Sequence, residues 1–234
     1  MTCLALVSFV ALILVALPLN LETRRKITGR AALIWFGLTG ITHTITGQEL
    51  LQESPAVVVA NHASYIDGIL LNAVLPPQYA FVIKREVTRA PFVHFLLRRI
   101  GAHFVERKNR YRGGKDARNI VEKAADGASV AVFPEGTFTA TPGLAHFRSG
   151  AFAAAVAGQV PVIPLVITGS RYILPADRLL PRPGPIGIRI LPPIHCTGSG
   201  RDAMRRLANH SRTAILEHLD EPDLLAQREA ASGR

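Results

Sequence analysis

The chain is predicted to be an α/β protein, with a mostly parallel mixed sheet flanked by helices and an N-terminal membrane-associated helical segment. Three observations support this prediction. The 234 residues are 48% hydrophobic, which is enough to fill a sizeable core. From residue 49 onward, short apolar runs alternate with helix-like stretches, a pattern typical of a sheet covered on both faces. Residues 3–19 form a nearly unbroken apolar run.

The apolar run reads CLALVSFVALILVALPL. At about 1.5 Å per residue, a helix of this length crosses most of a bilayer core about 30 Å thick, near the short end of the usual range. A signal peptide is the competing interpretation, but no lysine or arginine precedes the run and no A-x-A pattern follows it. The cations behind the run are Arg24, Arg25, Lys26 and Arg30. They predict that the rest of the chain, with its active site, lies on the cytoplasmic face of the membrane.

A second, less apolar stretch covers residues 31–45. It is predicted to be an interfacial helix that forms a hairpin with the first run, or else an amphipathic helix packed on the main domain. The domain prediction follows from these segments. Residues 1–47 are expected to be membrane-anchoring helices, residues 48–220 an α/β domain, and residues 221–234 a polar tail that frays.

Within the α/β domain, apolar runs and helical periodicity predict the individual elements. The expected strands are 56–60, 81–83, 103–105, 129–133, 162–167 and 187–191. The expected helices are 69–74, 91–99, 117–125, 149–157 and 201–219.

The amino-acid composition indicates which class of binding partner to expect. A net charge of +10 favours anionic partners, and 6% aromatic residues with scattered arginines favour a lipid bilayer over nucleic acid. The two cysteines, Cys3 and Cys196, do not suggest a disulfide framework or a zinc pattern. Neither a metal nor a cofactor is expected.

A candidate catalytic pair follows the first strand, which runs directly into Asn61-His62-Ala63-Ser64-Tyr65-Ile66-Asp67. A histidine with a nearby carboxylate can act as a general base, because the carboxylate orients the imidazole and stabilises its charged form. On one continuous helix, His62 and Asp67 would lie about 140° apart. They can meet only if His62 lies in a loop and the helix begins after it, as the capping-box pattern Ser64-x-x-Asp67 suggests. The alternative is that Asp67 merely caps the helix.

The same spacing occurs a second time, in His218 and Asp223. No strand precedes this copy, and Pro222 interrupts it. It is therefore interpreted as a coincidence of composition.

Three further segments place charged residues at strand ends or in loops, where functional residues concentrate. They are residues 101–107, 133–137 and 147–150. Arg107 and Arg148 can hold a phosphate through paired hydrogen bonds, and Lys84 ends another strand nearby in the sequence. Taken singly, each arginine reads as a surface charge.

Together these segments resemble the glycerolipid acyltransferase family, which includes the bacterial 1-acyl-sn-glycerol-3-phosphate acyltransferases. The first family block, N-H-x-S-x-x-D, matches residues 61–67, and the second, G-x-x-F-x-x-R, matches residues 101–107. The third, F-P-E-G-T, matches residues 133–137, and a V-P-V-x-P strand matches residues 160–164. One departure is Arg148, which stands where the family usually has lysine.

The resemblance implies that His62 is the general base and Asp67 its orienting partner, with transfer of a fatty acyl group from acyl-CoA or acyl carrier protein to a lysophospholipid. It assigns Arg107, Arg148 and Lys84 to the acceptor phosphate, and Glu135 to a glycerol hydroxyl. The full set of expected substrate-binding residues is Asn61, Ser64, Lys84, Gly101, Phe104, Arg107, Glu135, Gly136, Thr137 and Arg148.

Three alternatives stay open at this point. The acceptor can be another lyso-lipid, such as lyso-ornithine lipid, or glycerol-3-phosphate. The His-Asp pair can serve a hydrolase, although the G-x-S-x-G pattern of many hydrolases does not occur in the sequence. The chain can also be a catalytically silent membrane protein. Because the motif loops contain no cysteine and Ser64 is assigned to capping, direct transfer without an acyl-enzyme is expected.

Overall fold

A computed structural model describes residues 2–52, 55–84, 91–105, 128–178 and 180–232. Its strands are β1 (Ile41–Thr46), β2 (Val57–Ala60), β3 (Ala80–Lys84), β4 (His103–Val105), β5 (Val130–Val132), β6 (Val162–Thr168) and β7 (Gly184–Ile190). Its α-helices are α1 (Thr2–Ala16), α2 (Leu21–Leu38), α3 (Ile66–Val74), α4 (Pro91–Arg99), α6 (Gly150–Gly158), α7 (Ser170–Ile173), α8 (Gly200–Leu216) and α9 (Leu224–Ser232). A short 3₁₀ helix, η1, covers Gln48–Gln52.

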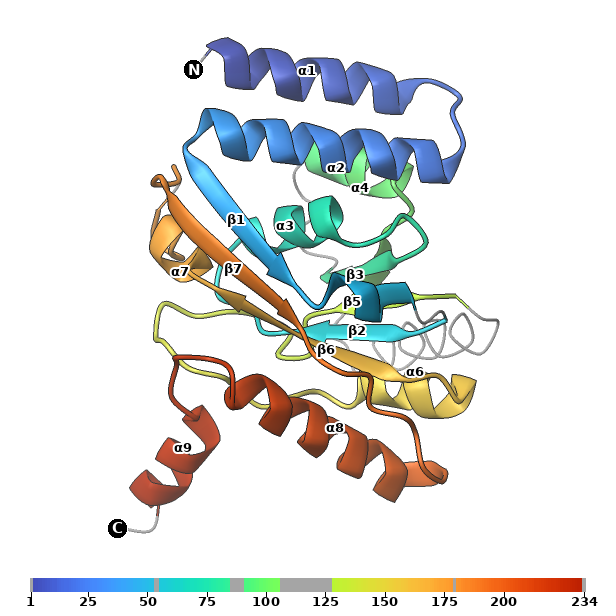
Figure 1. Ribbon diagram of the computed structural model, residues 1–234, viewed down its shortest axis with the longest axis vertical. Coiled ribbons are helices and arrows are strands. Elements are labelled where there is room, and N and C mark those ends of the chain that lie inside the picture. Colours follow the sequence, from blue (N-terminus) through green and yellow to red (C-terminus); the bar gives the residue numbers. More distant parts are fainter. Residues whose placement is uncertain (1, 53–54, 85–90, 106–127, 179, 233–234) are drawn as a thin grey trace.

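The described strands form one seven-stranded sheet in the order β1-β7-β6-β2-β5-β3-β4 (Figure 1). All neighbouring strands are parallel except β6 and β7, which are antiparallel. The predicted mostly parallel mixed sheet is therefore confirmed.

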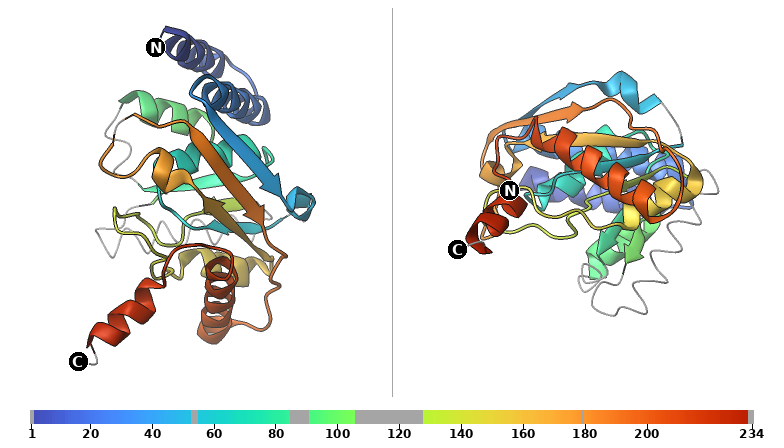
Figure 2. Two further views of the ribbon diagram at one scale, coloured as in Figure 1. Left: turned by 60° about the vertical axis from the view of Figure 1, so that its left-hand side comes forward. Right: turned by 90° about the horizontal axis from the view of Figure 1, so that it is seen from below.

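Helices cover both faces of the sheet. Alternate residues of β2 point to opposite faces, so Val57 and Val59 pack with α6 and α8, whereas Val58 and Ala60 pack with α3. Figure 2 shows from two further sides that α6 and α8 lie together, across the sheet from α2 and α3. All four residues of β2 are fully buried, which explains its continuous apolar sequence.

The largest error of the sequence-based prediction lies in residues 31–45, which were expected to be one helix. Helix α2 begins earlier, at Leu21, and ends at Leu38, two residues before Gly40 takes a positive φ of 71°. Residues Ile41–Thr46 then form β1, which pairs with β7. The strand reads ITHTIT, and this alternation of β-branched residues was a signal for a strand. The basic cluster behind the apolar run belongs to α2.

The first helix, α1, packs against α2 and leaves several large apolar side chains exposed: Leu6, Phe9, Val10, Ile13 and Leu14. Among the described residues, none of the helices combines the length and the apolar character that crossing a membrane requires. The expected helix at 117–125 lies outside the described residues.

Candidate active site

The candidate site forms where three neighbouring parallel strands end. Strand β2 lies between β5 and β6, so the loops that follow these strands meet at one edge of the sheet. The carboxyl edge of a parallel sheet is the usual location of ligand sites in α/β proteins. The loop after β2 carries His62, and the loop after β5 carries Glu135.

His62 and Asp67 meet as the sequence analysis required. His62 lies in the loop, α3 begins at Ile66, and the distance from His62 Nδ1 to Asp67 Oδ2 is 2.9 Å. Asp67 is fully buried, whereas the His62 side chain is 17% exposed. An ionised carboxylate only accepts hydrogen bonds, so Nδ1 carries the proton and Nε2 is the ring nitrogen available to a substrate.

The same carboxylate oxygen also fixes the loop. Asp67 Oδ2 accepts hydrogen bonds from the backbone N–H groups of Ala63 and Ser64, at 2.7 and 2.8 Å. Asp67 therefore binds the imidazole and shapes the turn that carries it. The capping and catalytic interpretations of Asp67 thus describe one arrangement.

Two aromatic rings hold the imidazole. The Phe133 ring stacks on His62 with centroids 4.1 Å apart, and the Phe138 ring meets it edge-on at 4.6 Å. Phe138 also contacts Tyr65 edge-on at 4.8 Å. The sequence analysis did not assign these phenylalanines a role, although both adjoin or belong to the third family block.

Glu135 binds main chain with both carboxylate oxygens. Oε1 accepts the N–H of His62 at 2.8 Å, and Oε2 accepts the N–H of Ala145 at 2.9 Å. Burial raises the pKa of Glu135, and these two hydrogen bonds act in the opposite direction. Both carboxylate oxygens of Glu135 thus bind the backbone of two loops, and Glu135 also lines the cavity beside His62. Its binding of a glycerol hydroxyl stays a prediction.

Asn61 and Ser64 also bind protein groups rather than facing the cavity. The Asn61 amide donates to Ile167 O and accepts from Ile167 N, at 2.9 and 2.7 Å, and so joins β2 to β6. The buried Ser64 hydroxyl donates to Leu174 O at 2.6 Å and accepts from Ile66 N at 3.2 Å. Their geometry is that of residues that position the His62 loop.

A cavity of about 690 Å³ opens beside His62. Its volume is in the range of small-molecule sites. Arg148 lies on it as an exposed side chain, with its Nε 3.4 Å from Glu135 O. The lining residues are His62, Glu135, Thr137, Phe138, Thr139, Thr141, Gly143, Ala145, His146, Arg148, Arg171, Leu224 and Gln227.

The other predicted site residues lie elsewhere or outside the described part. Gly136 has a φ of 82° and makes the turn in which its N–H binds Phe133 O. Gly101 packs beneath Leu21 of α2, and Phe104 lies on the edge strand β4. Arg107 and the side chain of Lys84 lie outside the described residues, so their assignment to the phosphate stays a prediction.

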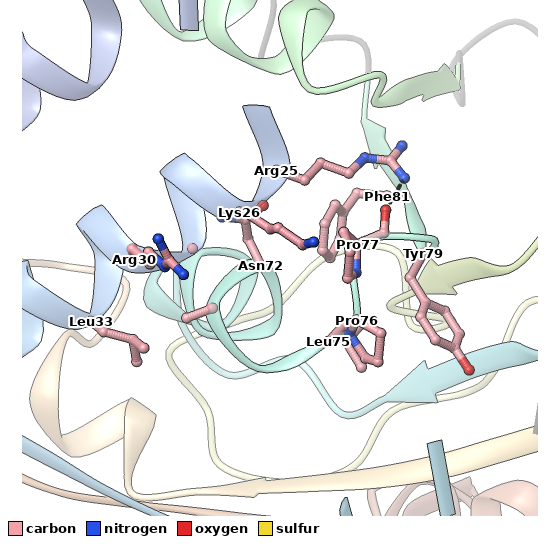
Figure 3. Close-up of a pocket in the computed structure, with 12 residues that line it drawn as sticks. Arg25, Lys26, Arg30, Leu33, Asn72, Leu75, Pro76, Pro77, Tyr79 and Phe81 are labelled. Atoms are coloured by element: carbon pink, nitrogen blue, oxygen red, sulfur yellow. Dashed lines mark hydrogen bonds between the residues drawn. The ribbon is translucent and has the colours of Figure 1, made fainter. Parts of the chain in front are cut away.

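A second, smaller cavity of about 170 Å³ lies between α2 and α3, away from His62 (Figure 3). Arg25, Lys26 and Arg30 border it, but Lys26 is paired with Glu22 at 2.6 Å. The buried Arg25 guanidinium donates to the carbonyl oxygens of Pro77 and Ile100 at 2.7 and 2.8 Å. Arg25 therefore stabilises the packing of α2.

The residues after Glu221 were expected to fray, and this expectation was wrong for the part that the structure describes. The chain forms α9, and Leu224 and Gln227 of this helix line the cavity beside His62. Glu221 binds Arg171 through both carboxylate oxygens, at 2.7 and 2.9 Å. Polar composition alone did not indicate these contacts, because they depend on partners far away in the sequence.

Comparison with known proteins identifies the family of the chain. The family model described as Acyltransferase matches residues 42–168, which include His62, Asp67 and Glu135. The chain is 32% identical to the 1-acyl-sn-glycerol-3-phosphate acyltransferase of Escherichia coli (strain K12), over 75% of this chain and 72% of that protein. The chain belongs to the acyltransferase family. It is thus an enzyme, and the silent membrane protein no longer stands as an alternative.

Two further comparisons extend this result. The enzyme is 29% identical to the 1-acyl-sn-glycerol-3-phosphate acyltransferase of Haemophilus influenzae, over 80% of this chain and 77% of that one. The crystal structure of the 1-acyl-sn-glycerophosphate acyltransferase PlsC from Thermotoga maritima has the same fold, with a TM-score of 0.72 over 90% of this chain and 87% of that chain, at 24% identity.

Proposed function

We propose that the enzyme transfers a fatty acyl group from acyl-CoA or acyl carrier protein to the free sn-2 hydroxyl of 1-acyl-sn-glycerol-3-phosphate, which gives phosphatidic acid. The observation that carries the proposal is the His62–Asp67 pair at 2.9 Å, with the imidazole between two aromatic rings at the edge of a large cavity. The names of the bacterial relatives support the choice of acceptor.

In the proposed reaction, His62 Nε2 takes the proton of the acceptor hydroxyl while the oxygen attacks the thioester carbonyl carbon. A C–O bond forms and the carbonyl becomes a tetrahedral oxyanion, which backbone N–H groups of the surrounding loops can stabilise. The C–S bond then breaks, and the leaving sulfur takes the proton from the imidazolium. Asp67 favours the charged imidazole throughout.

Direct transfer is favoured over an acyl-enzyme. The Ser64 hydroxyl is buried and bonded to Leu174 O, and Cys196 does not line the cavity. The kinetics should therefore be sequential. Enzyme mixed with acyl thioester alone should release no stoichiometric thiol, and an acyl adduct on Ser64 or Cys196 would overturn direct transfer.

Arg148 and Arg107 are assigned to the acceptor phosphate. Arg148 borders the cavity that contains His62, and its exposed guanidinium can offer paired donors to phosphate oxygens. Replacing either arginine with alanine should raise KM for the lysophospholipid more than KM for the thioester. A rise in the donor KM alone would reverse the assignment.

We also infer that α1 and α2 attach the enzyme to a bilayer, with the active site on the cytoplasmic face. Exposed apolar side chains on α1, such as Phe9 and Ile13, and the cations of α2 support this inference. Deleting residues 1–21 should lower the membrane-bound fraction. An unchanged fraction would show that α1 does not contribute to attachment.

The test of the main proposal is incubation of the enzyme with labelled acyl-CoA or acyl carrier protein and a panel of acceptors. The panel contains 1-acyl-sn-glycerol-3-phosphate, lyso-ornithine lipid and glycerol-3-phosphate. We expect labelled phosphatidic acid as the main product. Labelled free fatty acid formed without any acceptor product would instead support a hydrolase.

A further inference from the structure

The start of α9 forms a wall of the catalytic cavity. Leu224 and Gln227 line the same space as His62, although they lie more than 150 residues away in the sequence. They also lie outside residues 42–168, the part of the chain that matches the family model. The match to the family model therefore says nothing about this wall.

Two arginine–carboxylate pairs fix this wall to the loop after β5. Arg212 binds Asp223, with Nη1 3.0 Å from Oδ2, and also donates to Leu144 O at 3.0 Å. Glu221, paired with Arg171, accepts the N–H of Gly143 at 2.7 Å. The wall is thus tied to the loop that also binds Glu135 through Ala145.

The contact between the wall and this loop is close. Gly143 has a φ of 134°, and a Cβ at this position would lie 2.6 Å from the Leu224 side chain and 2.8 Å from Pro222 O. Leu144 completes the contact by exchanging backbone hydrogen bonds with Pro222 and Leu224, at 2.9 and 3.2 Å. Leu224 is therefore held in place at the cavity.

Several residues that line the cavity are uncharged, and they include both hydrogen-bonding and apolar side chains. Thr137, Thr139 and Thr141 offer hydroxyl groups, and Gln227 offers a carboxamide that has no hydrogen-bond partner among the described residues. Phe138 and Leu224 supply apolar surface.

The charged side chains that hold this wall in place are engaged with other protein groups. Arg171 is neutralised by Glu221, and the Glu135 oxygens face the backbone. Arg148, an exposed cation of this cavity, is already assigned to the acceptor phosphate, and an acyl chain would require a continuous apolar lining. Alternating hydrogen-bonding and apolar groups instead match a ligand in which amides alternate with methylene and methyl groups.

We propose that this wall binds the pantetheine arm of the acyl donor, with Gln227 hydrogen-bonded to the amide farther from the thioester and Leu224 in contact with the apolar groups next to that amide. Coenzyme A and acyl carrier protein share this arm, so the wall serves either donor. The inference rests on the proposed function, in which the donor is a thioester of one of these carriers.

The test compares three donors that carry the same acyl chain: acyl-CoA, acyl carrier protein and acyl-N-acetylcysteamine. The last keeps the thioester and one amide but lacks the rest of the arm. The variants are Gln227→Ala and Leu224→Ala, with Leu225→Ala as the matched control, since Leu225 does not line the cavity. Thermal unfolding of each variant verifies that the fold is retained.

For Gln227→Ala and Leu224→Ala, we expect KM for the carrier-bound donors to rise about three- to tenfold, the range for loss of one hydrogen bond or one apolar contact. KM for acyl-N-acetylcysteamine and for the acceptor should not change, and Leu225→Ala should leave all values unchanged. If both carriers support transfer, a rise in KM with only one of them would contradict binding of the arm that they share.

Two further results would overturn the inference while leaving the proposed function intact. One is unchanged donor KM in both wall variants, and the other is a rise in the acceptor KM instead. If the unmodified enzyme transfers no acyl group from any of the three donors, the proposed function itself fails.

Discussion

Two segments of this chain share the pattern of a histidine followed five residues later by an aspartate, and they fold differently. His62 and Asp67 form a hydrogen bond of 2.9 Å. His218 instead has its Nδ1 3.0 Å from Ala214 O, while Asp223 binds Arg212. The same spacing thus gives a candidate catalytic pair in one place and two unrelated contacts in the other.

The difference depends on where the histidine stands relative to the neighbouring helix. His62 leaves a buried strand and precedes α3, so Asp67 in the first turn can bind both the imidazole and the loop. His218 follows the last turn of α8, and its ring nitrogen lies close to a carbonyl oxygen of that same turn. A spacing motif therefore predicts chemistry only together with the elements that precede and follow it.

The largest effect is expected from the histidines themselves. Replacing His62 with alanine removes the general base and should lower kcat by about 10²–10⁴-fold. His218→Ala should leave activity nearly unchanged, because this side chain is exposed and does not line the cavity. The measurement is steady-state acyl transfer by both variants. Equal losses would contradict the assignment of the base.

The second-largest effect on kcat is expected from replacing the two aspartates. Asp67→Asn keeps one oxygen for the N–H groups of Ala63 and Ser64, so the fold should be retained. The new amide NH₂ would take the place of Oδ1, which has no hydrogen-bond partner among the described residues. An amide cannot stabilise the imidazolium as a carboxylate does, so kcat should fall by about 10²-fold or more. Asp223→Asn, measured in the same assay, should lower kcat far less.

A smaller effect is expected at Glu135, which joins the His62 loop to the loop after β5. Glutamine has one acceptor oxygen, so Glu135→Gln can bind the N–H of His62 or of Ala145 but not both. Losing a hydrogen bond to a charged group should lower the free energy of unfolding by about 1.5–3 kcal/mol and also lower kcat. Chemical denaturation and kinetics measure the two effects. An unchanged kcat with a higher acceptor KM would support the glycerol-binding role.

The smallest effect concerns stability against pH at Asp223. The hydrogen bond from Arg212 lowers the pKa of this carboxyl from 3.8 to about 2. Because the folded-state pKa is depressed, the stabilisation is complete above pH 3.8 and is lost as the pH falls through about 2. Asp223→Asn should therefore reduce the free energy of unfolding at pH 7 by roughly 0.2–1 kcal/mol, as for other partly exposed ion pairs. The difference from the unmodified protein should shrink between pH 4 and pH 2, and a constant difference would contradict this origin.

The buried strands, the mostly parallel sheet and the position of His62 at a strand end could all be predicted from the amino-acid sequence. These follow from short-range patterns, because a continuous apolar run such as residues 56–60 predicts a buried strand wherever it pairs. The capping pattern Ser64-x-x-Asp67 even indicated that the helix begins after His62. Residues 31–45 were the exception, since the composition of the whole stretch concealed the alternation of ITHTIT.

Which side chains share a cavity, and which bind the main chain, depends on long-range packing and could not be predicted from the sequence. Asn61 and Glu135 look alike as motif residues, yet Asn61 binds Ile167, 106 residues away, and Glu135 binds the N–H of His62, 73 residues away. The wall formed by Leu224 and Gln227 depends on ion pairs such as Arg171–Glu221, which join residues 50 apart. Contacts of this kind arise from the packing of segments that are distant in the sequence, so local sequence patterns do not predict them.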